Sequence, residues 1–329
     1  MNTIKLSYII TTRNKLPYIK NALTKLLEYF EKDEEIVVID AGSTDGTKEY
    51  LSDLYEKGVI HQFVSEPDKG ESHGWNKALL MAKGELIKLI TDDDPYYYPG
   101  IKKCKEFMLE HKDVEVLGFD GFYSDMELSK INIRPVFTCK DYVKWMEDKT
   151  PFLFCGISIM IRRSAIPFIG LFHSGFVAVD YEYTLRITSI NVKMAWYSGY
   201  CFVNIKNEKS NSSLQVEKIV AEREKVFYFY LNKPIVKANK LITRAKKLLR
   251  PLKEKLIKPK KNPEFKIYYY PDSIVEKTNL KSELNNKHYL FADYWLTQFN
   301  AINNGEFLFK EIPTNYLGKS LKLVIPPID

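Results

Sequence analysis

A short apolar run, Leu86–Ile90, stops abruptly at Thr91 and is followed by three consecutive aspartates at 92–94. An apolar run bounded by turn residues is typical of a buried strand, and Pro95 cannot continue a strand because it lacks a backbone N–H. The carboxylates are therefore expected at the carboxyl end of a buried strand, which is where open α/β sheets bind their ligands. This stretch predicts both a buried sheet and a polar site at one of its edges.

The three carboxylates of Asp92, Asp93 and Asp94 repel one another on a single turn. A hard divalent cation, Mg²⁺ or Mn²⁺, takes oxygen ligands and commonly shares them with substrate phosphates. The alternative is a helix start, with Asp94 as the N-cap and Pro95 as the first helical residue. Three acids after a buried strand favour the metal site over the cap.

Strands and helices alternate along the chain before this run. Apolar strand-like segments are predicted at 6–10, 35–39 and 60–65, and helical spacing of apolar residues at 17–30, 47–55 and 75–82. Alternation of this kind is typical of βαβ units, which build a mostly parallel sheet. Asp40, the loop at 66–71 and the aspartates at 92–94 should then line one rim of that sheet.

The turn after the second predicted strand contains Asp40, Gly42, Asp45 and Gly46. The dinucleotide fingerprint requires three glycines, and a pyrophosphate bound here would meet Asp45, so we exclude nicotinamide and flavin dinucleotides. The chain also has no Walker lysine motif. Asp40 is interpreted either as an acceptor for a base or ribose, or as an Asx-type turn acid.

Three segments in consistent order and spacing carry a family resemblance: SYIITTRN, IVVIDAGSTDGTKEYL and EPDKGESHGWNKALLMAKGELIKLITDDD. They resemble the nucleotide-binding half of family 2 glycosyltransferases of the GT-A fold, over about the first hundred residues. The resemblance implies one Rossmann-like α/β domain with a mostly parallel central sheet. It also implies binding of a nucleotide-diphospho-sugar with Mn²⁺ or Mg²⁺ and transfer of the sugar with inversion.

The same resemblance assigns roles to single residues. Those implied to bind the donor are Thr11, Arg13, Asp40, Asp68, Lys69, Asp92 and Asp93, and those implied to bind the metal are Asp94 and Asp92. Uridine is the expected base, although Ala41 replaces the second acid that many relatives have after this strand. Taken alone, Lys69 is also consistent with an ordinary solvated lysine, and His73 with a surface residue.

A second site residue is expected beyond a predicted buried strand at 153–162. Asp180 lies at the start of a predicted helix, and the resemblance makes it the general base. Inverting transfer needs a carboxylate that accepts the proton of the acceptor hydroxyl as it attacks the anomeric carbon. The alternative is an acid that only stabilises a helix N-terminus.

The formal charge of +7 is unevenly distributed. Residues 235–261 contain eleven lysines and arginines and one acid, a net charge of +10, so the remainder carries −3. A basicity confined to one segment argues against a nucleic-acid partner. Its apolar residues recur at spacings of three and four, which predicts a basic amphipathic helix on an anionic membrane surface; the alternative is a packed helix with a solvated basic face.

The predicted organisation has three parts: a catalytic domain at 1–207, a basic helical segment at 208–262 and a small C-terminal α+β module of unnamed role at 263–329. The four cysteines show neither a disulfide-framework nor a metal-ligand spacing, which suits a reducing compartment. No signal peptide or membrane span is recognisable from the sequence. We therefore expect a cytoplasmic protein, peripheral on the inner face of the cytoplasmic membrane.

The predicted function is that of an inverting, metal-dependent, hexosyltransferase-like enzyme. It would move a sugar from a nucleotide-diphospho-sugar to a hydroxyl of a glycan or lipid-linked saccharide in surface polysaccharide synthesis. A UDP-sugar is the favoured donor. One alternative is a sugar nucleotidyltransferase, but residues 11–14 lack the glycine-rich, arginine-bearing loop that such an enzyme would need. The other is a non-catalytic adaptor that binds nucleotide sugars, which would be expected to lose one of the acids.

Overall fold

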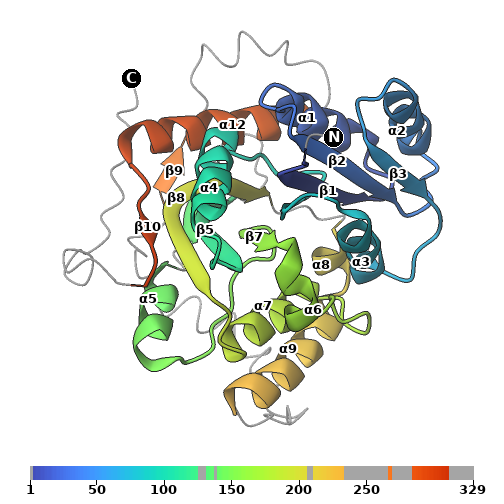
Figure 1. Cartoon of the computed structure of the whole chain (residues 1–329). Helices are drawn as coiled ribbons and strands as arrows, with labels where there is room; N and C mark the ends of the chain where they lie inside the picture. The colour runs from blue at the N-terminus through green and yellow to red at the C-terminus, as the bar shows by residue number, and fades with distance from the viewer. Residues whose placement is uncertain are drawn as a thin grey trace, which may run out of the picture.

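One mixed β-sheet organises the molecule (Figure 1). The computed structural model describes residues 3–124, 131–136, 139–205, 210–232, 266–268 and 284–310. The described strands are β1 (Leu6–Thr12), β2 (Glu34–Asp40), β3 (Gln62–Ser65), β4 (Leu86–Ile90), β5 (Val116–Ser124), β6 (Ile131–Val136), β7 (Ile159–Arg162), β8 (Met194–Ile205), β9 (Lys266–Tyr268) and β10 (Phe307–Leu308). The main path through the sheet is β10-β8-β5-β7-β4-β1-β2-β3, and β6 joins β5 to β9 off that path.

The described helices lie on the two faces of this sheet or at its ends. They are α1 (Leu16–Leu27), α2 (Thr47–Glu56), α3 (Glu71–Met81), α4 (Tyr98–Glu110), α5 (Cys139–Asp148), α6 (Ile166–Ile169), α7 (Val179–Ser189), α8 (Asn211–Leu214), α9 (Val216–Leu231) and α12 (Leu284–Ile302). In the part of the chain that is described, no helix combines the length and apolar character needed to cross a membrane.

Most strands run in the same direction. β1 is parallel to β2 and β4, β2 to β3, and β5 to β8. β7 is antiparallel to both β4 and β5, so those two strands also share a direction. The carboxyl ends of β1 to β5 and β8 therefore meet at one edge, here called the site edge. The predicted α/β fold with a mostly parallel sheet is confirmed.

Both faces of the sheet are buried because successive strand residues point to opposite sides. On β1, Ile9 contributes to a core with α3, α5 and α7, whereas Tyr8 and Ile10 contribute to a core with α1, α2 and α4. The same alternation holds for β2 and β4. The central strands are therefore mainly apolar, with the buried Lys88 in β4 as an exception.

The longest described strand, β8, was not predicted. It lies between β5 and β10, and its carboxyl end shares a third cluster of buried side chains with α12, including Tyr200, Val203, Trp295 and Phe299. α12 and β10 come from the segment predicted as a C-terminal module, and they pack on the sheet of the predicted catalytic domain (Figure 1). The division of the chain at 207 and 262 stays a prediction, since both positions lie outside the described residues.

The strand predicted at 153–162 is corrected by the structure. Only Ile159–Arg162 forms β7, because the preceding residues make a turn in which Cys155 O accepts hydrogen bonds from the N–H and the Oγ of Ser158. Helices α9 and α12 lie on either side of the basic segment in the sequence. The basic segment at 235–261, predicted as an amphipathic helix, lies outside the described residues.

Candidate active site

The acidic turn, which consists of Asp92, Asp93 and Asp94, leaves β4 at the site edge. Two of its carboxylates are bound by the segment between β1 and α1. Thr12 Oγ1 donates a hydrogen bond of 2.7 Å to Asp92 Oδ2, and Lys15 Nζ lies 2.6 Å from Asp93 Oδ2. The first two acids of the turn therefore face the end of β1.

The alternative interpretation of this turn, a helix cap at Asp94, is wrong. α4 begins at Tyr98 with Tyr97 in the N-cap position, and the proline near its start is Pro99. Asp94 instead joins the turn to β8: its Oδ1 accepts a hydrogen bond of 2.7 Å from the backbone N–H of Ile205. β8 therefore holds the acidic turn in place.

Electrostatics make the acidic turn a cation-attracting site. Burial and the charge of Asp93 raise the pKa values of Asp92 and Asp94 well above the usual range. Burial alone would lower the pKa of Lys15, but the negative charges of Asp92 and Asp93 together have the larger effect and raise this pKa to about 12. Lys15 pairs with Asp93, which leaves Asp92 and Asp94 as the carboxylates that could hold a divalent cation.

Asp40 ends β2 beside the acidic turn, in register with Thr12 on one side and Ser65 on the other. Its side chain is fully buried and accepts hydrogen bonds from the N–H and Oγ of Ser43 and, at 2.6 Å, from Ser65 Oγ. Gly42, with φ of +75°, allows the chain to turn back so that Ser43 reaches this carboxylate. Asp40 is thus bonded within its own turn, and a nucleobase that bonds to it must replace one of these donors.

The remaining predicted donor residues are spread around α3 and the start of α1. Thr11 and Asp68 converge on Gly74, since a Cβ there would lie 3.0 Å from Thr11 Cγ2 and 3.3 Å from Asp68 Oδ2. Arg13 and Lys69 have exposed side chains. Lys69 N–H donates to His73 Nδ1 at 3.1 Å, so His73 stabilises the loop before α3.

Asp180 is presented by the first turn of α7. Its Oδ2 accepts a hydrogen bond from Gly156 N–H at 3.4 Å, near the long limit for such a bond. A Cβ at position 156 would lie 2.9 Å from the Asp180 Cβ, so glycine permits this close approach. Burial raises the pKa of Asp180 to about 6, which suits a carboxylate that accepts a proton near neutral pH.

Cys155 connects the two halves of the site. Burial raises the pKa of its thiol to about 12, with further contributions from the charges of Asp180 and Asp94. Gly156, the next residue, contacts Asp180. Lys88 in β4 is completely buried and donates a hydrogen bond of 2.7 Å to Ile157 O, which ties the strand before the acidic turn to the turn that carries Cys155 and Gly156.

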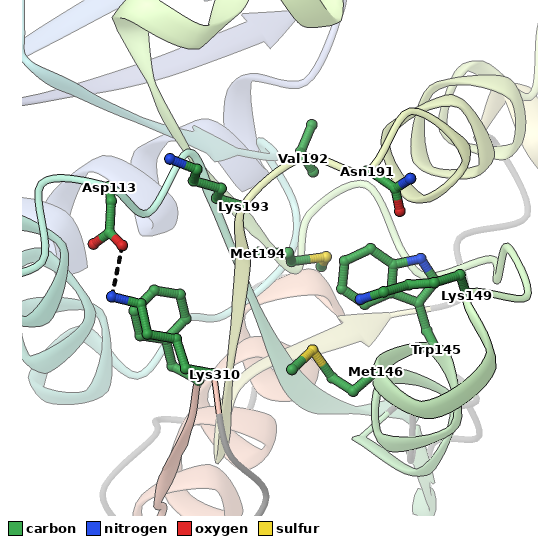
Figure 2. A pocket seen from close by; sticks show the side chains of 10 residues that line it. Asp113, Trp145, Met146, Lys149, Asn191, Val192, Lys193, Met194 and Lys310 are labelled. Carbon is green, nitrogen blue, oxygen red and sulfur yellow. Dashed lines mark ion pairs between the residues drawn. The ribbon is translucent and has the colours of Figure 1, made fainter.

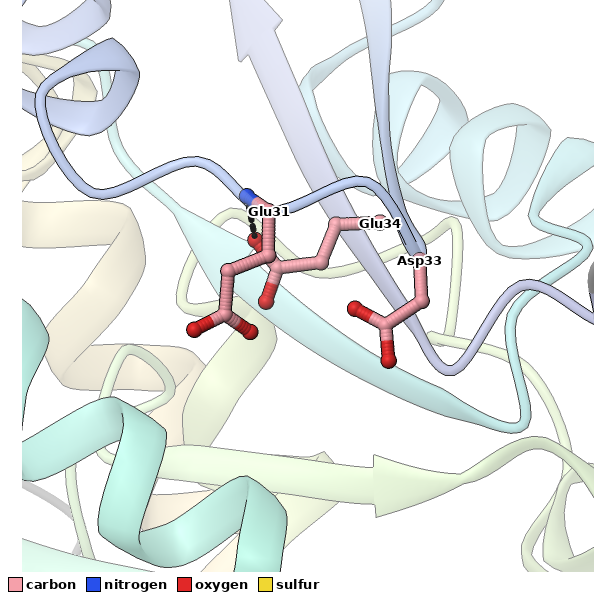
Figure 3. A group of neighbouring side chains, drawn as sticks. All are labelled: Glu31, Asp33 and Glu34. Carbon is pink, nitrogen blue, oxygen red and sulfur yellow. Dashed lines mark hydrogen bonds between the residues drawn. The ribbon is translucent and has the colours of Figure 1, made fainter.

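A second acidic cluster, Glu31, Asp33 and Glu34, lies at the start of β2, at the edge opposite the site edge (Figure 3). Among the described residues it is the one group of three acids whose ligand atoms lie within 4.8 Å of one another. Lys105 Nζ contacts all three carboxylates at 2.7, 2.7 and 2.9 Å, and Lys102 Nζ lies 2.5 Å from Glu34. These two lysines offset two of the three negative charges, so the cluster is an ion-pair network that joins β2 to α4.

A surface pocket of about 410 Å³ also lies away from the site edge, at the start of β8 (Figure 2). Its lining includes Trp145, Lys149 and Lys310. Lys149 Nζ lies 4.2 Å above the Trp145 ring, and Lys310 Nζ pairs with Asp113 at 2.7 Å. The pocket contains none of the predicted catalytic or donor residues.

Several residues of the site were not predicted from the sequence. Thr12, Lys15, Ser65, Gly156 and the end of β8 contact the predicted acids. Thr12 is the last residue of β1 and Lys15 follows it by three residues, so their position at the end of a predicted strand was a usable signal. Gly156 and Ile205 gave none, because their partners are 24 and 111 residues away in the chain.

The sequence of this chain is similar to those of bacterial glycosyltransferases. The TuaG protein of Bacillus subtilis, named as a teichuronic acid biosynthesis glycosyltransferase, is 32% identical over 106 residues, which cover 32% of this chain and 42% of TuaG. An uncharacterised glycosyltransferase of Haemophilus influenzae is 24% identical over 247 residues, which cover 70% of this chain and 96% of the relative. The chain thus spans less than half the length of the first relative.

Two solved structures share the fold. TarS 1–349 of S. aureus in complex with UDP-GlcNAc superposes with a TM-score of 0.50 at 19% identity, covering 79% of this chain and 78% of TarS 1–349. The mannosyltransferase PcManGT of Pyrobaculum calidifontis, in complex with GDP-Man and Mn²⁺, gives a TM-score of 0.52 at 15% identity, covering 91% and 88%. Residues 7–167 match the sequence profile described as Glycosyl transferase family 2. This match, the glycosyltransferase relatives and the GT-A fold identify residues 7–167 as a region of glycosyl transferase family 2.

Proposed function

We propose that this protein is an inverting, metal-dependent glycosyltransferase that moves a sugar from a nucleotide-diphospho-sugar to a hydroxyl of a glycan or lipid-linked saccharide. One observation carries the proposal: Asp180 contacts Gly156, and the turn that carries Gly156 is bonded to Lys88 of β4, the strand that ends at the acidic turn. A carboxylate group for the leaving diphosphate and a carboxylate for the nucleophile can therefore serve one substrate. The match of residues 7–167 to family 2 argues against the nucleotidyltransferase alternative, and the retained acids argue against an adaptor.

The proposed donor is a UDP-sugar, with a GDP-sugar as the second candidate. TarS was solved with UDP-GlcNAc and PcManGT with GDP-Man, and both share this fold. The rim formed by Thr11, Arg13, Asp40, Asp68 and Lys69 is the proposed nucleoside and donor surface. Synthesis of a surface polysaccharide is the proposed context, since TuaG is named for teichuronic acid biosynthesis.

The proposed metal ligands are Asp94 and Asp92, and their donor chemistry fits Mn²⁺ or Mg²⁺. These cations are commonly held by one or two carboxylates together with substrate phosphates and water, so two aspartates suffice. Asp93 is proposed to serve the donor, and its pairing with Lys15 leaves the other two acids for the cation. When bound, the cation would neutralise the charge that develops on the departing nucleoside diphosphate.

Asp180 is proposed to accept the proton of the acceptor hydroxyl. The hydroxyl oxygen then attacks the anomeric carbon from the face opposite the diphosphate, and the carbon–oxygen bond to the diphosphate breaks. The transition state at the sugar has oxocarbenium character, and no covalent intermediate with the protein is required. The half-buried position of Asp180 keeps it basic enough to take a proton near neutral pH.

A screen of donors by thermal shift tests the function. UDP-, GDP- and dTDP-sugars are added with Mn²⁺, with Mg²⁺ or with EDTA. A ligand at 100 times its Kd stabilises a protein by about 2.7 kcal/mol, so the proper donor should raise the Tm by roughly 5 °C. EDTA should remove most of that rise. If no nucleotide sugar raises the Tm with either cation, the proposed activity is wrong.

The proposed partner of residues 235–261 is an anionic membrane surface on the inner face of the cytoplasmic membrane. Each basic residue near such a surface contributes about 1 kcal/mol of attraction. The preceding helices add exposed apolar side chains, among them Leu214 and Phe229, which are 70% and 75% exposed. A membrane location would suit a lipid-linked acceptor.

Sedimentation with liposomes checks this partner. The protein should sediment with vesicles that contain phosphatidylglycerol and should stay in the supernatant with neutral phosphatidylcholine. Replacing Lys246, Lys247 and Arg250 by glutamate should reduce the bound fraction severalfold. The matched control replaces three exposed lysines elsewhere, Lys48, Lys57 and Lys83, and should bind as the wild type does. Equal binding by both triple variants would rule out the basic segment as the membrane-binding element.

A further inference from the structure

α9 packs against α7 and contacts it before and after Asp180 (Figure 1). Glu222 Oε2 on α9 accepts hydrogen bonds of 2.8 and 3.0 Å from the backbone N–H groups of Val177 and Ala178. Further along α9, Tyr230 Oη donates 2.7 Å to Glu182 Oε1. Ala178 and Glu182 lie two residues before and two residues after Asp180, so α9 holds the backbone on either side of the proposed base.

Glu222 is a buried carboxylate, although the bonds described above are to two backbone N–H groups and not to a cation. It is 6% exposed, and burying a carboxylate is unfavourable unless the site is well paired. Within the described residues its other oxygen, Oε1, is buried without a hydrogen-bond partner, and Lys218 Nζ lies 3.9 Å from it. The two N–H bonds are therefore the principal compensation for a buried charge.

The hydrogen bond that the carboxylate of Asp180 makes across the site is long. Gly156 N–H lies 3.4 Å from Asp180 Oδ2, whereas both bonds to Glu222 are within 3.0 Å. The far side of α7 is fixed by Arg186, which pairs with Glu182 and donates to Ile169 O and Leu171 O at 2.6 and 2.7 Å. The entry to the helix, which sets the position of Asp180, is the part held by Glu222.

We propose that Glu222 is a positioning residue that fixes the first turn of α7 and so directs Asp180 toward the acceptor hydroxyl. Tyr230 supplies the second contact between α9 and α7. The inference rests on the proposed role of Asp180 as the base. A displacement of about 1 Å at a reacting group lowers a rate by about a hundredfold, so loss of the contact acts on transfer. Among the described residues, Glu222 bonds to Val177, Ala178 and Lys218, none of which is a proposed donor or metal residue.

The experiment compares Glu222→Ala, Glu222→Gln and Tyr230→Phe in the full-length protein. Glu222→Ala should lower kcat of transfer by ten- to a hundredfold, with donor Kd and donor KM within twofold of wild type. Glu222→Gln keeps a carbonyl acceptor for the two N–H groups and should restore kcat to within about threefold. Tyr230→Phe, the milder variant, should lower kcat a few-fold. Glu217→Ala, an exposed acid on the same helix, is the matched control and should leave all values unchanged.

Rates are normalised to the concentration of sites that bind donor, so that poor folding alone cannot lower kcat. If Glu222→Ala lowers only the Tm, while kcat per donor site stays at the wild-type value, Glu222 is merely structural and the inference is overturned. If Glu222→Ala does not fold, the other two variants decide. The inference is also overturned if Tyr230→Phe has the wild-type kcat while Glu222→Gln has a kcat as low as that of Asp180→Asn. Asp180→Asn separates the two levels: a fully active Asp180→Asn refutes the proposed base and this inference, whereas an inactive Asp180→Asn with unchanged Glu222 variants refutes this inference alone.

Discussion

Asp180→Asn should abolish sugar transfer while donor binding stays within about twofold of wild type. The substitution keeps the size of the side chain and its contact with Gly156 N–H, but an amide cannot accept the proton of the acceptor hydroxyl. General bases contribute about 10²- to 10⁴-fold, so kcat should fall by at least a hundredfold. The rate of transfer is measured from the release of the nucleoside diphosphate. Donor binding is measured by calorimetry.

The control is Asp53→Asn, an exposed carboxylate on α2 that pairs with Lys57, and it should transfer at the wild-type rate. The pH profile provides an independent check. Burial raises the pKa of Asp180 to about 6, so the base is ionised above that pH and protonated below it. kcat/KM for the acceptor should therefore fall about tenfold per pH unit below pH 6, and this acid limb should be missing from any residual activity of the variant. Transfer by Asp180→Asn at the wild-type rate would show that another group is the base.

The three aspartates of the acidic turn should respond differently to substitution by asparagine. Asp92→Asn should lose most of the tightening of donor binding by Mn²⁺ and keep its Tm, because Asp92 is held in the structure by the Thr12 hydroxyl, which can also donate to an amide oxygen. Asp94→Asn should lose the same metal response and also about 1–3 kcal/mol of stability, because an amide replaces a buried carboxylate that accepts from Ile205 N–H, Thr91 and Asn204.

Asp93→Asn serves as the matched variant. Its carboxylate pairs with Lys15 at 2.6 Å. We expect the Kd for the donor to rise only a few-fold, and the response of donor binding to Mn²⁺ to be preserved. The measurement is a donor titration in Mn²⁺ and in EDTA, together with thermal unfolding of each variant. A full Mn²⁺ response in both Asp92→Asn and Asp94→Asn, or its loss in Asp93→Asn alone, would contradict the assignment of the ligands.

The alternation of strands and helices in the first hundred residues was predictable because local patterns specify it. Apolar runs such as Leu86–Ile90 end at turn residues, and helical spacing separates them, so the sequence predicted β1 to β4 and the side chains at their ends. β8 escaped prediction because Ser198 and Gly199 interrupt its apolar run. β8 is nevertheless a single strand because it pairs with β5 along its length, with register shifts near Asp120.

The sequence by itself determined that Asp40 and the acidic turn lie at strand ends on one rim, because hydrophobic periodicity and turn chemistry act over a few residues. It also marked Asp180 as the acid at the start of a later helix. Only the tertiary structure decided which groups hold these carboxylates: Thr12 and Lys15 at the acidic turn, Ile205 on Asp94, Gly156 beside Asp180 and Glu222 beneath its helix. Such contacts join residues 24 to 111 positions apart, and local patterns carry no information about how distant segments pair.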